Sequence, residues 1–487
     1  MIEVGLEVDH LVFGIGKVVS VLGDVATVEF FGEELDVEVR DLRPRLNHPD
    51  PGSQPQQSQP VSDQAFRKVF EAVNLGVVPT DPERLVNLTI GGEELAEEIS
   101  HLLDRAPESG LCRVYMGYYG SGKSHHLRVV KSVALRDGWV TASVELDPKA
   151  ADPAKPSTVY QALTSGLEFP TRTDGSRSLD FFDLVKEIRD NWTTIRGLSY
   201  VRRSPWFSQG LKALLYLSHR RDDSDYVSAV NWLAGQMKQI RTIRSLSWQA
   251  GYREKIPTLP QVKDTGIVYA YNLVVLHDIV KSLGYKGLVI IIDEAEHVRT
   301  YSFNRYARAN NFFDVLARCA HRPRYNLDNP DDDYEHFDLP RFWREGPHFA
   351  LFVGLTEGED TRYLRRKVGE ISVFIHDKSD VVLLSSANDA DYEKWVLDFL
   401  KECGERLGPK VQILVDPDVR TRIAGILRTR FGEAPVDERI LRNWTKLAGF
   451  CPAVLLSHTR EVGIDELAKS VDEAARQVAG EVLPWDE

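Results

Sequence analysis

Residues 117–124, GYYGSGKS, fit the pattern G-x-x-x-x-G-K-[ST] at every position. Gly120 and Gly122 allow the backbone to curl so that successive N–H groups point at a phosphate. In such a loop Lys123 would reach the β- and γ-phosphates of ATP, and the Ser124 hydroxyl would take a position on Mg²⁺. The pattern therefore predicts an ATP·Mg²⁺ site that is formed by Gly117, Gly120, Ser121, Gly122, Lys123 and Ser124.

Two histidines, His125 and His126, follow the loop directly. We include His125 among the residues expected to bind the nucleotide. The alternative is that both side chains face solvent and the flank of the helix.

The run LVIIIDE at residues 288–294 ends in two carboxylates. Its five apolar residues predict a strand buried on both faces, and the carboxyl end of such a strand is where α/β sheets bind ligands. Asp293 would hold Mg²⁺ through water, and Glu294 would orient or deprotonate the attacking water. A glutamate at this position favours ATP hydrolysis over simple binding.

A third apolar run, residues 348–355, predicts another strand and ends at Thr356. Many ATPases place a polar residue at such a strand end to hold the attacking water, and Thr356 suits that role. The alternative is a threonine that merely ends a strand. The catalytic residues predicted from the sequence are Glu294, Lys123 and Thr356.

The elements around the loop predict an α/β fold of the P-loop type. A strand at 111–116, a helix at 129–135 and a strand at 139–146 follow one another, as in a parallel sheet. An amphipathic helix at 90–106 precedes them, and Pro107 and Gly110 are expected to break it. The long gap between Lys123 and Asp293 implies a helical insertion or elaborated crossover at about 155–275.

Three further segments flank this core, which we place at residues 63–385. Residues 1–46 have short Val/Ile/Phe-rich runs and glycine turns, resembling SH3-like or Tudor-like barrels, either as a docking module or as a structural appendage. Residues 47–62, rich in Pro, Gln and Ser, predict a linker. Residues 386–487 predict a helical lid or a winged-helix-like domain, with a short strand at 411–415.

Composition restricts the class of protein. Lys and Arg number 60 against 73 Asp and Glu among 487 residues, so the net charge of −13 argues against a protein that coats nucleic acid non-specifically. The four cysteines form no close pairs and predict neither disulfides nor a zinc site. No leader is recognised and the longest apolar runs fall far below the ~20 residues that span a bilayer, so we expect a cytoplasmic protein with no membrane contact.

Arginines follow both the acidic strand and the third strand. Ring or dimer ATPases commonly take an arginine from a neighbouring subunit, which makes a homo-oligomer one interpretation. The alternatives are contacts with DNA phosphates or solvated helix faces. The candidates are Arg299, Arg305, Arg308, Arg362, Arg365 and Arg366.

The motif set GYYGSGKSHHL, VNWLAGQ and GYKGLVIIIDEAEHV resembles the BREX-system ATP-binding proteins of the BrxD-like family, over residues 63–460. The resemblance implies an AAA+ P-loop ATPase related to the origin-recognition branch, acting in bacterial defence against phage beside a helicase or other defence protein. One position departs from that branch, because Ala453 stands where a sensor arginine is expected. Either Arg460 or another arginine replaces it, or the lid is coupled less tightly to the nucleotide.

Two main hypotheses follow from the sequence. In the first, the chain hydrolyses ATP slowly to change its grip on partners, with a helicase or DNA among them. In the second, it is a nucleotide-gated scaffold or helicase loader with negligible turnover. A third and weaker hypothesis, DNA binding through a C-terminal winged helix, is opposed by the negative net charge.

Overall fold

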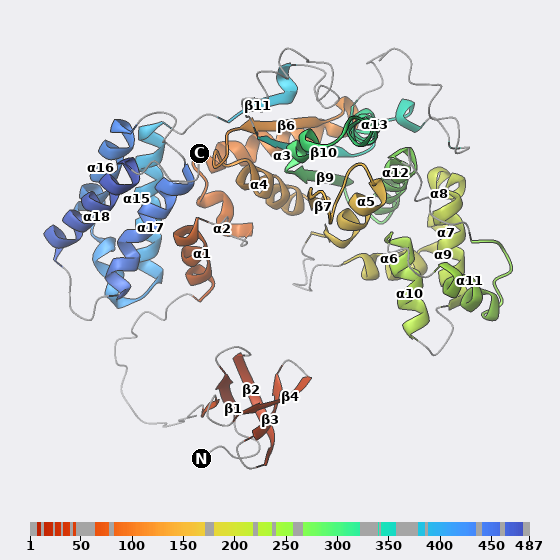
Figure 1. The fold of residues 1–487 in the computed structure, drawn as a ribbon, viewed down its shortest axis with the longest axis horizontal. Helices are drawn as coiled ribbons and strands as arrows, with labels where there is room; N and C mark the ends of the chain where they lie inside the picture. Colours follow the sequence, from red (N-terminus) through yellow and green to blue (C-terminus); the bar gives the residue numbers. More distant parts are fainter. Residues whose placement is uncertain are drawn as a thin grey trace. The chain divides into compact units, whose positions relative to one another are not determined.

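The chain divides into two compact units, Met1–Gln59 and Pro60–Glu487. A computed structural model describes both units (Figure 1). The described residues are 7–10, 14–22, 25–30, 33–38, 42–44, 64–76, 82–170, 180–217, 223–235, 240–256, 266–321, 339, 342–356, 378–384, 388–434, 441–457 and 463–480.

The first unit is a five-stranded antiparallel sheet in the order β4-β3-β2-β1-β5. Its core includes the buried side chains of Val18, Ala26 and Val28. The likeness to an SH3-like or Tudor-like barrel stays a prediction, and the segment 47–62 lies outside the described residues. The strands are β1 (Glu7–His10), β2 (Gly14–Leu22), β3 (Val25–Phe30), β4 (Glu33–Glu38) and β5 (Leu42–Pro44).

The second unit contains a six-stranded sheet in the order β11-β6-β10-β9-β7-β8. Neighbouring strands are parallel from β11 to β7, and only the short β8 pairs antiparallel. This sheet confirms the predicted parallel α/β fold. The strands are β6 (Cys112–Gly117), β7 (Val140–Glu145), β8 (Leu167–Glu168), β9 (Leu288–Asp293), β10 (Ala350–Thr356) and β11 (Val381–Leu383).

Helices α2 (Pro82–Asn87), α3 (Gly92–Ser109) and α4 (Lys123–Arg136) share one apolar cluster with the sheet. Ile99 and Leu103 of α3 are fully buried there. Of the two residues expected to break α3, Gly110 does so, because it caps the helix directly after Ser109, whereas Pro107 lies inside the last turn. Pro107 has no N–H to donate to the Leu103 carbonyl, and the helix ends two residues after it.

A second cluster joins the sheet to the helical insertion and to α13 (Phe303–Ala320). Within the insertion, Tyr200 and Arg203 contact Glu345, and Trp206 is buried. In the basic, aromatic segment 200–206, Val201, Ser204 and Trp206 are buried, whereas Arg202 and Arg203 are exposed. The helices are α5 (Pro156–Ser165), α6 (Phe181–Asp190), α7 (Trp192–Ile195), α8 (Ser199–Arg203), α9 (Pro205–Leu217), α10 (Asp223–Leu233), α11 (Ile240–Gln249) and α12 (Gly266–Ser282).

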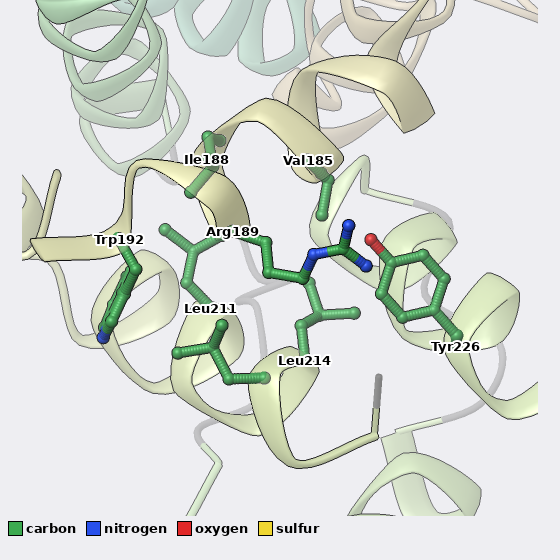
Figure 2. Close-up of a pocket in the computed structure, with 8 residues that line it drawn as sticks. Val185, Ile188, Arg189, Trp192, Leu211, Leu214 and Tyr226 are labelled. Carbon is green, nitrogen blue, oxygen red and sulfur yellow. The ribbon is translucent and has the colours of Figure 1, made fainter. Parts of the chain in front are cut away.

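A small pocket lies among α6, α9 and α10 of the insertion (Figure 2). Figure 2 shows the Tyr226 hydroxyl turned toward the guanidinium of Arg189. The rest of the lining is almost entirely apolar, which is typical of a seam between packed helices. The lining residues are Val185, Ile188, Arg189, Trp192, Leu211, Leu214, Leu215 and Tyr226.

The C-terminal part consists of α15 (Asp389–Arg406), a 3₁₀ helix (Pro409–Val415), α16 (Pro417–Glu433), α17 (Leu441–Ser457) and α18 (Ile464–Gly480). We call these helices, blue in Figure 1, the C-terminal bundle. The strand expected at 411–415 is wrong, because Gly408-Pro409 starts a 3₁₀ helix there. The described residues from 388 to 480 contain no strand, so nothing described supports the wing of a winged helix.

Helix α1 (Gln64–Leu75) packs with the C-terminal bundle, although the sequence places it in the ATPase segment. Phe66, Val69, Phe70 and Val73 belong to the same apolar cluster as Trp444 of α17. The two ends of the second unit thus share one core. No helix in the described part of the chain is long and apolar enough to cross a membrane.

Candidate nucleotide-binding site

The register of the sheet brings the predicted site residues to one edge. Thr356, at the end of β10, pairs with Gly117 at the end of β6. On the next strands Val353 pairs with Ile292, and Asp293 pairs with Glu145. Since these strands are parallel, the phosphate loop, Asp293 and Thr356 all lie at their carboxyl ends, where α/β sheets bind ligands.

The loop between β6 and α4 has the backbone that its glycines predict. Gly120 and Gly122 adopt φ values of 78° and 95°, which a side chain would strain. A Cβ at Gly117 would overlap the Ser121 hydroxyl. The Ser121 Oγ is buried and has no hydrogen-bond partner among the described residues. A loop with an unpartnered buried hydroxyl and a helix N-terminus behind it fits an oxygen-rich anion.

Lys123 is the first residue of α4 and is only 6% exposed. Its Nζ donates to the carbonyl oxygens of Gly117 at 3.3 Å and Tyr118 at 3.1 Å. Burial lowers the pKa of Lys123, whereas the charges of Glu296, Glu294 and Asp293 act in the opposite direction. The loop and the acidic strand end are thus close enough for their charges to interact. Ser124, the next residue, is half-buried.

Asp293 ends β9, and its Oδ1 accepts from the Glu294 backbone N–H at 2.9 Å. Its neighbour on β10 is Gly354, where a Cβ would lie 2.5 Å from the Asp293 Oδ1 and 3.0 Å from Leu127. Only glycine therefore leaves room for the carboxylate at this point. Glycine inside a strand commonly marks such a close approach.

Glu294 has a φ of 57° and is the one non-glycine residue with positive φ in the described ranges. This left-handed backbone costs about 1–2 kcal/mol, and such strain concentrates at functional sites. Burial, the charge of Glu296 and a hydrogen bond to Glu296 raise the pKa of Glu294 to about 7. A carboxyl group with a pKa near neutrality is suited to accept a proton at physiological pH.

Glu296 is the acidic partner of both Glu294 and Thr356. Burial would raise the pKa of Glu296, but hydrogen bonds from the Thr356 hydroxyl and from backbone N–H groups lower it overall. Its Oε2 is buried with no partner among the described residues. The Thr356 side chain therefore contacts a carboxylate that contacts Glu294, so the three groups act together. The role of Thr356 in holding water stays a prediction.

His125 lies in a buried hydrogen-bond chain. The Thr89 hydroxyl donates to the Leu85 carbonyl at 2.6 Å, so at 2.7 Å it accepts from the His125 Nε2–H. Burial lowers the pKa of His125 to about 3, and the ring is neutral. One residue before Thr89, the Leu88 carbonyl accepts from the Trp395 indole at 2.8 Å. This chain links α4 to the C-terminal bundle, and contact of His125 with a nucleotide stays a prediction.

The bundle also contacts the phosphate loop directly. Arg442, in the first turn of α17, donates to the Tyr119 hydroxyl at 2.8 Å. Tyr118 and Tyr119 are 59% and 69% exposed. Ala453 lies eleven residues further along α17, about 16 Å at 1.5 Å per residue. The arginine of α17 that reaches the loop is therefore Arg442 and not a residue near position 453.

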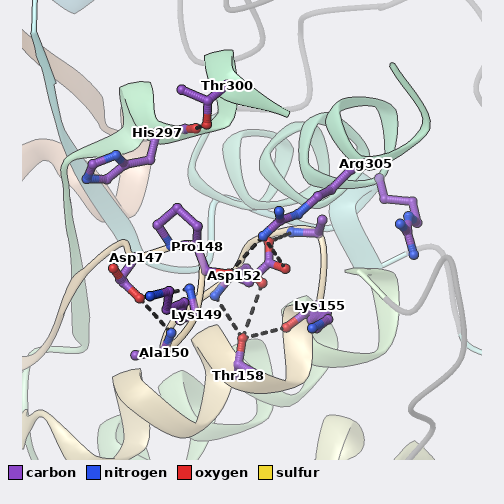
Figure 3. A network of polar contacts seen from close by, with 12 residues as sticks. Asp147, Pro148, Lys149, Ala150, Asp152, Lys155, Thr158, His297, Thr300 and Arg305 are labelled. Atoms are coloured by element: carbon purple, nitrogen blue, oxygen red, sulfur yellow. Dashed lines mark hydrogen bonds and ion pairs between the residues drawn. The ribbon is translucent and has the colours of Figure 1, made fainter. Parts of the chain in front are cut away.

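The arginines after the acidic strand make contacts inside the chain. Arg305 donates to the Pro148 carbonyl at 2.8 Å and to the buried Asp152 at 2.9 Å, as Figure 3 shows. This network clips the loop after β7 to α13. Arg299 donates to the Thr356 carbonyl at 3.0 Å, and Arg308 to a carbonyl of its own helix. Arg362, Arg365 and Arg366 lie outside the described residues.

Sequence reasoning missed three residues of this site. Glu296 was visible as a third acidic residue in DEAE, and Gly354 as a glycine inside the apolar run ALFVGLT. Arg442 carries no local signal, because its contact joins residues more than 300 positions apart.

A glycine-rich loop between a strand and a helix, facing the acidic end of a parallel strand of the same sheet, defines a P-loop nucleotide-binding protein. The family model "BREX system ATP-binding protein BrxC/D" matches residues 61–182 and 183–321, more than half of the chain. The chain belongs to this family, which is an ATP-binding component of the multi-protein BREX defence systems. No curated protein matches the chain.

Proposed function

We propose that this chain is an AAA+-type ATPase that binds ATP with Mg²⁺ and hydrolyses it to change its grip on other components of a BREX defence system. The observation that supports this most is the cluster at the sheet edge. Lys123 interacts with three carboxylates there, and Glu294 is held in a strained conformation with a pKa near 7.

In this proposal Lys123 exchanges the carbonyl oxygens of its own loop for phosphate oxygens. The carbonyls of Gly117 and Tyr118 lie at 3.3 and 3.1 Å, so a strong anion replaces two weak acceptors. Glu294 takes a proton from the attacking water, and Glu296 holds Glu294 and Thr356 together. The order of the strands supports the sensor role of Thr356, because β10 lies between the loop strand and the acidic strand.

Magnesium fits the donor set at this edge. The Ser124 hydroxyl and the Asp293 carboxylate are oxygen ligands, and Mg²⁺ usually takes one or two carboxylates together with substrate phosphates. Gly354 leaves the space that the Asp293 carboxylate occupies. When bound, the ion would neutralise charge that develops on the phosphates.

Arg442 would couple the C-terminal bundle to the nucleotide in place of an arginine at position 453. Its guanidinium already contacts the loop through Tyr119, whose ring is exposed. A bound triphosphate is a stronger acceptor for a guanidinium than a phenol is. Movement of the bundle would then follow the state of the nucleotide, and partners such as a helicase or DNA would sense that movement.

The alternative is a nucleotide-gated scaffold or helicase loader with negligible turnover. The missing arginine at position 453 is the observation that favours it. In that case the strained Glu294 would serve only to hold the bound state.

Purified full-length protein and its Glu294→Gln variant separate the two functions. ATP binding by calorimetry should be equal within about threefold, while phosphate release should fall by about 100-fold or more in the variant. Phosphate release that is equally slow in both proteins would contradict hydrolysis through Glu294. It would support the nucleotide-gated scaffold instead. Absence of ATP binding with Mg²⁺ in both proteins would contradict both.

A further inference from the structure

Helix α11 of the insertion carries only basic charges, although the whole chain has a net charge of −13. Its sequence, IRTIRSLSWQ, contains two arginines and no acidic residue. The exposed Arg253 follows just after the helix, and the exposed Glu254 beside it pairs with Lys212 of α9 at 3.3 Å. A local basic surface on an acidic protein is the kind of feature that selects a polyanion.

Trp248, near the end of α11, is 58% exposed. By contrast Trp206 and Trp232 of the same insertion are 6% and 1% exposed. The Arg253 guanidinium lies 4.2 Å from the Trp248 ring centroid, and its Nη1 donates to the Trp248 carbonyl at 2.8 Å. The ring is thus fixed in place by a cation while more than half of its surface stays open.

Further exposed groups lie on the Trp248 face of α11 and beside the turn that ends the helix. Arg241 and Ser245 are exposed and precede Trp248 by seven and three residues, which puts them on one face of the helix. Tyr216 of α9, 47% exposed, lies 3.9 Å from the position of a Cβ on Gly251, in the turn that ends α11. We call Tyr216, Arg241, Ser245, Trp248 and Arg253 the α11 patch.

We propose that the α11 patch binds single-stranded nucleic acid, with a base stacked on Trp248 and phosphates on Arg241 and Arg253. Exposed aromatic rings beside basic side chains are the elements that bind single strands without sequence preference. An unpaired base offers its face to the ring, whereas a duplex presents mainly phosphates and groove edges. The proposal goes beyond ATP binding and needs no nucleotide.

Tryptophan and arginine are also frequent in protein–protein hot spots, but those lie in well-packed pockets from which the surrounding contacts exclude water. The exposed neighbours of Trp248 on α11 are Ser245 and Gln249, which are polar. The charge of the patch and this polar surround favour nucleic acid over a protein surface.

The test uses the full chain without ATP and labelled oligo-dT, oligo-U and a matched duplex, each about 20 nucleotides long. We expect at least one of the two single strands to bind, and comparing oligo-dT with oligo-U distinguishes DNA from RNA. Trp248→Ala should weaken binding about tenfold or more, and Trp248→Phe about threefold or less. Arg241→Ala should lower the slope of log affinity against log salt by about 0.7.

Two variants serve as matched controls. Phe303→Ala removes an aromatic ring that is 84% exposed outside the insertion, and Lys469→Ala removes a cation that is 78% exposed on the bundle. Neither should change affinity. Stacking should also quench tryptophan fluorescence in the wild type, and that quenching should be much smaller in Trp248→Phe.

The proposal is overturned if no single strand binds, if Trp248→Ala binds as the wild type does, or if Phe303→Ala loses as much affinity as Trp248→Ala. Duplex binding that is tighter than single-strand binding and indifferent to Trp248 also overturns it. Because ATP is absent throughout, these outcomes leave the proposed ATPase function untouched.

Discussion

The carboxyl edge of the sheet and the α11 patch hold their charged groups in opposite surroundings. At the edge Lys123 is 6% exposed and interacts with three carboxylates, whereas the patch leaves Trp248 58% exposed beside open arginines. Buried charges need partners at defined positions, because each unpaired one is costly. Exposed charges are screened and act nearly independently. A single substitution at the edge should therefore abolish most of its function, whereas each substitution in the α11 patch should remove only part of the binding affinity.

The largest effect is expected from Lys123→Ala. Removing the buried ammonium group of Lys123 leaves the carboxylates of the edge facing the incoming phosphates, so ATP affinity should fall by about 100-fold or more. Oligonucleotide affinity without ATP should be unchanged, since the patch lies in the insertion. Calorimetry with ATP and fluorescence anisotropy with oligo-dT measure the two. Equal losses of ATP affinity and of oligonucleotide affinity in Lys123→Ala would contradict the distinction between the two regions.

A single methyl group should matter at the edge. In Gly354→Ala the new Cβ would lie 2.5 Å from the Asp293 Oδ1, so the carboxylate must shift, and we expect about tenfold lower turnover with a higher magnesium requirement. Gly425→Ala is the matched control, because nothing lies within 4 Å of a Cβ at that position of α16. It should leave turnover unchanged and stabilise the helix by about 0.5–1 kcal/mol. Normal turnover in Gly354→Ala would contradict the close approach.

The pH dependence of turnover tests the coupling between Glu294 and Glu296. Glu294 must be ionised to accept a proton, so kcat/KM should rise as pH passes through about 7. Glu296→Gln removes a neighbouring negative charge and keeps an oxygen that accepts from Thr356. The pKa of Glu294 should then fall and the rising limb should move to lower pH by about one unit. Titration of ATP itself affects the wild-type and Glu296→Gln profiles equally. Superimposable profiles of the two proteins would contradict the coupling between Glu294 and Glu296.

The smallest effect is expected from the contact between Arg442 and Tyr119, because both groups are exposed, like those of the α11 patch. Arg442 and Tyr119 meet through one hydrogen bond between exposed groups, so Arg442→Ala should weaken ATP binding only about threefold. Tyr119→Phe removes the acceptor of this hydrogen bond, so it should affect the nucleotide-free protein and not the contact of Arg442 with bound ATP. Measured together, the two changes should be non-additive, and strict additivity in the double variant would show that the contact carries no energy.

Much of the edge could be predicted from the sequence because its chemistry is local. Residues 117–124 and 288–294 each contain both the strand and the groups that the strand positions. Runs of apolar residues predicted β6, β7, β9 and β10 for the same reason. Glu296 was missed because its contacts with Glu294 and Thr356 depend on the turn after β9.

Other features depend on contacts that no local pattern records. The apolar residues 411–415 predicted a strand but form a 3₁₀ helix, where Val411 and Leu414 enter the bundle core. The segment 200–206 is basic and aromatic in sequence, and the contacts of Tyr200 and Arg203 with Glu345 join residues more than 100 positions apart. The exposed Trp248 was invisible for the opposite reason, since a tryptophan in an amphipathic helix is usually buried.

The hydrogen-bond chain between the C-terminal bundle and α4 has a mechanical consequence. The indole of Trp395 holds Leu88, the adjacent Thr89 binds His125, and His125 belongs to the helix that starts at Lys123. A partner that displaced the bundle would thus displace α4, and with it the Lys123 ammonium group, through the side chains of Trp395, Thr89 and His125. Binding of a nucleotide at Lys123 and binding of a partner at the bundle would then act on the same helix.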